Sequence, residues 1–133
     1  LQYLDNGTIE IYGGTCTGPL FGAGVQIGEL KILGGTIIGD TYGVDATSAT
    51  ATVTIGSKDN KSNTTTPVIQ STNIGVRNNV ATFNFYDGII KGAAGKSIAG
   101  TVNDKEEGYK VLKGTETIEG TTYETSTLYF AAS

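Results

Sequence analysis

The hydrophobic positions of this chain alternate with polar positions in short runs that end at glycine pairs. The stretch GELKILGGTIIG at 28–39 places Leu30 and Ile32 on one side of a short strand, turns at Gly34-Gly35 and continues with a second apolar run. Alternation with a period of two is typical of β-strands, whereas an amphipathic helix repeats about every 3.6 residues. The pattern therefore predicts short strands joined by tight corners.

This pattern recurs along the chain. Two further copies, GTIEIYGGTCTG and ATFNFYDGIIKG, occupy 7–18 and 81–92, and a shortened copy, ATVTIG, occupies 51–56. A Gly-Val step recurs as well, in AGV at 23–25, YGV at 42–44 and IGV at 74–76. The spacings predict a coil of about 20 residues, shorter than the roughly 30 residues of a βαβ unit, with the polar loop 57–66 inserted in one coil.

Stacking the copies aligns their apolar side chains in three ranks. The first rank contains Ile9, Leu30, Val53 and Phe83, the second Ile11, Ile32, Ile55 and Phe85, and the third Cys16, Ile37 and Ile90. One coil cannot bury its apolar side alone, so the coils must stack about 4.8 Å apart to share a core. The sequence therefore predicts an all-β fold, a parallel β-solenoid over 1–102.

The glycine pairs of the three full copies fall at equivalent positions. These positions are Gly13-Gly14, Gly34-Gly35 and Asp87-Gly88. We interpret them as corners of the coil, where glycine reaches a positive φ without a Cβ clash. A phosphate-binding loop would need a following Lys-Ser/Thr and a helix, which the pairs lack, so no nucleotide or other cofactor is expected.

The two ends of the chain differ. Segments 108–113 and 121–129 are rich in β-forming residues, and with the connector 114–120 they predict an antiparallel hairpin that caps the solenoid within 103–133. The acids Asp104, Glu106 and Glu107 are expected in a solvated turn, with a calcium site as the alternative. Residues 1–5 lead almost directly to a first strand at Thr8, so the first coil is expected to expose an open edge, for preceding coils or for a second molecule.

Composition and charge narrow the possible functions. The chain has 133 residues, 20 glycines, no histidine and a net charge of −4, and Arg77 is its one arginine. Without histidine it lacks the commonest general base and a common metal ligand, and without a basic patch nucleic acid is not expected as a partner. No apolar run approaches the roughly 20 residues of a membrane span. The lone Cys16 is expected as a small buried apolar residue, with an intermolecular disulfide or a reactive thiol as the alternative.

Polar side chains on the outward face of the strands give the candidate binding surface. Its residues are Tyr42, Thr52, Thr54, Thr82 and Asn84. Glu10, Glu29, Asp40 and Asp45 do not pair in the alignment as the two carboxylates of a polysaccharide lyase or hydrolase would, so we expect no catalytic residues and no enzyme. A flat threonine array for ice binding is interrupted by the charged Glu29 and Lys31.

One stretch carries a resemblance to a known group. GTIIG, IGVRNNVATFNFYDGIIKG, SIAGTV, EEGYKV and TTYETSTLY, within 28–129, resemble the C-terminal β-helical repeat region of large uncharacterised secreted or cell-surface proteins of Gram-positive, clostridia-like bacteria. The resemblance implies a right-handed parallel β-helix and an extracellular location, and it implies no activity. Parallel crossovers are also right-handed in general.

We therefore expect a structural or adhesive segment of a bacterial surface or filament-forming protein. Its expected partners are other copies stacked end to end, preceding coils of a longer chain, or a host or cell-wall glycan. The alternative function is a non-catalytic carbohydrate-binding module, in which tyrosine rings stack on sugars.

Overall fold

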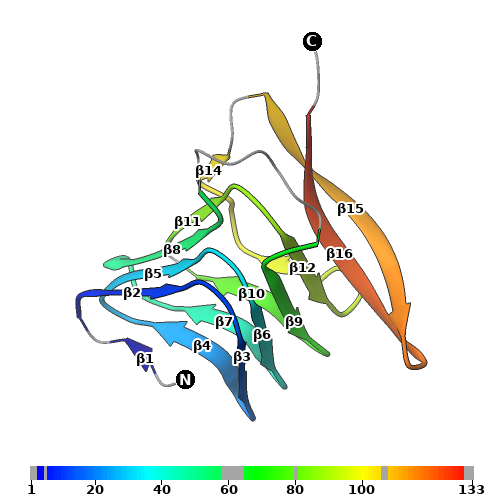
Figure 1. Ribbon diagram of the computed structural model, residues 1–133, viewed down its shortest axis with the longest axis horizontal. Coiled ribbons are helices and arrows are strands. Elements are labelled where there is room, and N and C mark those ends of the chain that lie inside the picture. Colours follow the sequence, from blue (N-terminus) through cyan, green and yellow to red (C-terminus); the bar gives the residue numbers. More distant parts are fainter. Residues whose placement is uncertain (1–2, 5, 58–64, 80, 106–107, 131–133) are drawn as a thin grey trace.

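The protein is built entirely from β-structure in the part of the chain that the structure describes. This computed structural model describes residues 3–4, 6–57, 65–79, 81–105 and 108–130, with the side chains of 3, 4 and 104 excepted. The strands form three sheets, named A, B and C. Strands of the same sheet lie side by side in Figure 1, and the chain visits the sheets in the order A, B, C.

Neighbouring strands of a sheet come from successive coils. From one edge to the other, sheet A contains β1 (Tyr3–Leu4), β4 (Phe21–Val25), β7 (Tyr42–Ala46), β10 (Ile74–Asn78) and β13 (Ile98–Ala99). Sheet B contains β14 (Asp104–Lys105), β11 (Thr82–Phe85), β8 (Ala51–Ile55), β5 (Gly28–Ile32) and β2 (Thr8–Ile11). Sheet C contains β15 (Tyr109–Ile118), β16 (Thr121–Phe130), β12 (Ile89–Gly92), β9 (Val68–Ser71), β6 (Thr36–Gly39) and β3 (Thr15–Gly18).

Sheets A and B are parallel throughout, and sheet C is parallel from β3 to β12. The predicted all-β architecture with parallel sheets is therefore confirmed. The structure adds β1, which pairs with β4 ahead of the expected first strand at Thr8. Of the inserted loop, 58–64 lie outside the described residues.

The three predicted ranks form the core. Ile11 pairs with Ile32, Ile32 with Ile55 and Ile55 with Phe85, as predicted for the second rank. The third rank has one member more than expected, because Ile69 on β9 lies between Ile37 and Ile90. All of these side chains except that of Ile11 are fully buried.

The alignment predicted from the Gly-Val steps is wrong by two residues at β4. Val44 lies beside Val76, as predicted, but its neighbour on β4 is Ala23, and Gly24 lies beside Asp45. Phe21 is the residue of β4 that pairs with Tyr42, so the equivalent positions on β4 come two residues earlier in the sequence than the AGV segment suggests.

The glycine pairs turn the chain at the expected corners. The second residue of each pair has a positive φ, +80° at Gly14, +83° at Gly35 and +94° at Gly88. At Gly35 a Cβ would also lie 2.7 Å from the carbonyl oxygen of Gly14, so stacked corners leave no room for a side chain there. Asp87 does not itself have a positive φ, so the special conformation belongs to Gly88 alone.

The corner glycines give a matched pair of substitutions. Gly14→Ala should lower the free energy of unfolding by about 1 kcal/mol, because alanine is strained at a positive φ. Gly13→Ala should cost nothing measurable, since Gly13 lacks a positive φ and a Cβ there meets no atom within 4 Å. Urea denaturation followed by circular dichroism measures both, and equal losses would contradict the corner assignment.

The predicted antiparallel hairpin is confirmed, with longer strands and a shorter turn. β15 and β16 pair along their whole length, from Tyr109 opposite Phe130 to Ile118 opposite Thr121. The connector expected at 114–120 is therefore mostly strand, and Glu119 and Gly120 make the turn. Both have positive φ, +49° and +83°, which is the pattern of a type I′ hairpin turn.

The hairpin lies against the last coil. β16 pairs antiparallel with β12 and so extends sheet C, as Figure 1 shows at its right. Leu128 is buried in the core, and Tyr109, Val111 and Val102 pack against it. β14 pairs with β11 in sheet B. The division of the chain near residue 102 into solenoid and cap stays a prediction.

Candidate functional site

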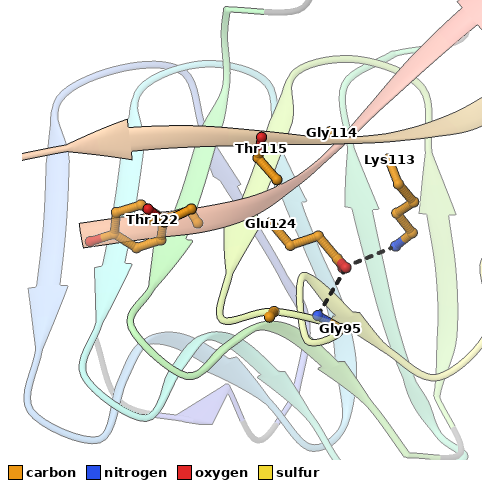
Figure 2. Close-up of a pocket in the computed structure, with 8 residues that line it drawn as sticks. Gly95, Lys113, Gly114, Thr115, Thr122 and Glu124 are labelled. Atoms are coloured by element: carbon orange, nitrogen blue, oxygen red, sulfur yellow. Dashed lines mark hydrogen bonds and ion pairs between the residues drawn. The ribbon is translucent and has the colours of Figure 1, made fainter. Parts of the chain in front are cut away.

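A cluster of polar side chains lies where the hairpin crosses the turn between β12 and β13. It borders a pocket of about 370 Å³ whose lining includes Gly95, Lys113, Gly114, Thr115, Thr122 and Glu124. Figure 2 shows Glu124 pointing from β16 toward Gly95 and Lys113. The pocket thus lies between the hairpin and a turn that is distant from it in sequence.

Glu124 is the centre of this cluster. Its Oε2 accepts the backbone N–H of Gly95 at 2.9 Å, and its Oε1 accepts the N–H of Ser97 at 3.1 Å and the hydroxyl of Ser97 at 2.5 Å. Lys113 Nζ lies 3.6 Å from Oε1. Since the carboxylate satisfies two backbone donors, it fastens the turn at 93–97 to the hairpin.

The charge of Glu124 is stabilised by these contacts. Burial by itself would raise the pKa of the carboxyl group, because it disfavours the charged form. The hydrogen bonds from Ser97 and Gly95 and the positive charge of Lys113 outweigh burial, so the pKa of Glu124 lies below its ordinary value. The carboxylate is therefore present at neutral pH.

Ser97, Ser126 and Lys113 complete the cluster. Serine and lysine are also the residue types of a nucleophile with its base, so their geometry has to be examined. Lys113 Nζ donates to Ser126 Oγ at 2.7 Å and to Ser97 Oγ at 3.0 Å, and the two hydroxyls lie 2.7 Å apart. Both serines are 0% exposed, so no substrate carbonyl reaches their hydroxyls. These contacts hold the hairpin against the turn at 93–97.

The sequence did not point to this cluster. Ser97, Lys113, Glu124 and Ser126 carry no motif, and they meet only through the antiparallel pairing of β16 with β12 and of β15 with β16.

Four of the five predicted surface residues lie together on the outer face of sheet B. Thr52 lies beside Thr82, and Thr54 lies beside Asn84. The Thr54 hydroxyl donates to Glu29 Oε2 at 3.1 Å, and Asn84 Nδ2 donates to Thr54 Oγ1 at 3.4 Å. Thr54 and Asn84 also line a groove of about 290 Å³ at the corner after β8 and β11.

Tyr42 lies elsewhere, at the start of β7 in sheet A. The Arg77 guanidinium lies 4.1 Å from the centre of its ring, and donates to both carboxylate oxygens of Asp45, at 2.6 and 2.8 Å. Arg77, which is distant in sequence, comes close because β7 and β10 are neighbours. Tyr42 is therefore not continuous with the other four residues, and a cation–π contact already uses one face of its ring.

Metal and membrane features are limited to a few observations. No group of three or more His, Cys, Asp or Glu residues in the described part of the chain is placed to hold a metal ion. The alternative calcium site falls outside the described residues, because Glu106 and Glu107 and the Asp104 side chain are not described. In the same ranges, no helix is long and apolar enough to cross a membrane.

Comparison with known proteins gives no relative to argue from. No protein-family model, curated protein or solved structure matches this chain.

Proposed function

We propose that this chain is a structural segment of an extracellular bacterial surface protein, a right-handed parallel β-helix whose stack of coils bears load. Three continuous ranks of apolar side chains and three hydrogen-bonded sheets support a mechanical role. The right hand follows from the general preference of parallel crossovers. The extracellular location rests on the resemblance of 28–129 to bacterial surface proteins.

The observation that carries the proposal is the unequal burial of the ranks. Leu30, Ile32 and Ile37 of the second coil are fully buried, whereas their equivalents in the first coil are only half-buried. Those equivalents are Ile9, Ile11 and Cys16. Exposed large apolar side chains gather near the same end, at Tyr12, Leu20 and Ile27. A further coil of β-structure stacked on β2 and β3 would bury this end.

At the opposite end the hairpin pairs with β12 and covers the edge of sheet C, although Leu112, Tyr129 and Phe130 of the hairpin are themselves exposed. Leu128 of the hairpin is buried in the core, and Val102, Tyr109 and Val111 pack against the core. In sheet C the hairpin occupies the place that a further parallel strand would take beside β12, whereas β2 and β3 have no outer neighbour among the described residues. This asymmetry favours a stalk or adhesin segment that is closed at one end over a filament that grows head to tail.

A charge placed on the open end of the stack, the outer side of β2 and β3, tests the proposal. The isolated chain should associate with rising concentration, and not beyond dimers, because two open ends can pair only once. Cys16→Asp should weaken the association at least tenfold in dissociation constant. Thr17→Asp, an equal charge on the outward face of the same strand, should leave it within about twofold. Sedimentation velocity under reducing conditions measures both variants, since no disulfide then forms.

Circular dichroism melting of each variant separates loss of association from loss of folding. A folded chain that stays monomeric at millimolar concentration would overturn the stacking end. Long filaments would overturn the closed hairpin end.

A further inference from the structure

A groove opens on the outer face of sheet B at the corner after β8, where Gly56 is one of its lining residues. The N–H of Gly56 donates to Ile32 O, just as the N–H groups of Leu33 and Tyr86 donate to the coil below them. Gly56 thus occupies the same corner rank as Leu33 and Tyr86. Where these two present side chains, Gly56 presents none, and the groove of about 290 Å³ lies between them.

The floor of this groove is an ordered set of polar side chains. Asn84, Thr54 and Glu29, from three neighbouring strands, form a continuous hydrogen-bonded chain. Lys31 Nζ lies 3.8 Å from Glu29 Oε1 at the side of the groove. Asn84 uses one N–H in this chain, which leaves its amide oxygen and second N–H for a ligand. The groove therefore offers donors and acceptors that are already held in place.

Charge and shape restrict what fits the groove. Glu10 and Glu29 carry two negative charges against one positive charge on Lys31, so an anionic ligand is disfavoured. Mixed donors and acceptors match hydroxyl groups, since each hydroxyl both donates and accepts. The half-buried Leu33 gives the groove an apolar wall that suits the face of a sugar ring, whereas Tyr86 is only 5% exposed. At about 290 Å³ the groove lies just below the roughly 300–1,000 Å³ that ligand pockets usually span, so it suits a small ligand.

We infer that this groove, lined by Glu29, Lys31, Leu33, Thr54, Asn84 and Tyr86, binds a short neutral oligosaccharide. The site differs from a tyrosine platform at Tyr42, which lies on sheet A. The six named residues come from β5, β8 and β11 and the corners that follow them, and Glu10 of β2 is a further lining residue.

Matched threonine variants test the site. A glycan array that carries neutral β-linked and α-linked oligosaccharides together with oligouronates identifies a ligand, and titration calorimetry with that oligosaccharide measures its affinity. Thr54→Val should weaken binding at least tenfold, because it breaks the chain between Glu29 and Asn84. Thr52→Val, on the same strand and the same face but outside the groove, should leave the dissociation constant within about twofold.

Amide chemical shifts in the complex locate the ligand independently of the variants, and melting curves show that each variant is folded. Shifts that gather on β5, β8 and β11 support the inference. Three results would overturn it: no neutral oligosaccharide bound at millimolar concentration, equal loss in Thr52→Val and Thr54→Val, or preferential binding of oligouronates. Abolition of binding by Tyr42→Ala with Thr54→Val unaffected would also overturn it, since it would place the ligand on sheet A.

Discussion

Phe85→Ala should lower the free energy of unfolding by about 3–5 kcal/mol, a large part of the stability of a domain of this size. Phe85 is 0% exposed and lies in register with Ile55, and its ring stacks on that of Phe83 with centroids 6.1 Å apart. The hydrogen bonds of the sheets fix the spacing of the coils, so the walls of the resulting cavity cannot collapse. Urea denaturation followed by circular dichroism measures the loss.

The second rank, which contains Phe85, also offers two isoleucines that differ in burial, so their substitution compares the effect of burial at one residue type. Ile55→Ala removes a fully buried side chain and should cost about 2–5 kcal/mol. Ile11→Ala removes the half-buried equivalent at the open end and should cost less than half as much, because water already reaches that position. Equal losses at the two positions would show that the first coil is as well covered as the third, contrary to the structure.

The periodic part of the fold was accessible from sequence because each coil repeats the same local solution. Alternating apolar residues and a glycine corner mark every full copy, so the ranks through Ile32 and Ile37 follow from alignment alone. Ile69 was missed because the polar loop separates β9 from β8 and hides the second half of that copy. The alignment of Gly24 with Gly43 was wrong because β4 contains two glycines, Gly22 and Gly24. Only the pairing of Phe21 with Tyr42 shows which of them is the equivalent of Gly43.

Contacts between side chains that are distant in sequence could not be predicted without knowing the register in which the strands pair. Arg77 and Asp45 form an ion pair because they occupy neighbouring positions on β10 and β7, and the sequence distance between them gave no hint of this. The cluster around Glu124 depends on two antiparallel pairings that no repeat encodes. By contrast, Thr54 and Asn84 came together as expected, since both belong to aligned copies of the repeat.

Removing the Glu124 carboxylate should detach the hairpin from the last turn. We expect Glu124→Ala to cost about 3 kcal/mol at pH 7, because the N–H groups of Gly95 and Ser97 lose a charged acceptor. The pKa of Glu124 is lowered in the folded protein, so the carboxylate contributes stability at pH values above its unfolded pKa. That contribution is lost as the pH falls through the lower, folded pKa.

The difference in unfolding free energy between the wild type and Glu124→Ala should therefore be constant near neutral pH and shrink below about pH 4.5. Thr122→Ala is the matched control, because it lies on the same strand and lines the same pocket, and its hydroxyl bonds that of Thr117. Its difference from the wild type should be small and independent of pH. Urea titrations between pH 3 and 7 measure both differences. If the Glu124→Ala difference grew in acid, the carboxyl group would be protonated in the folded protein, and its contacts with Ser97, Gly95 and Lys113 would not be those of a carboxylate.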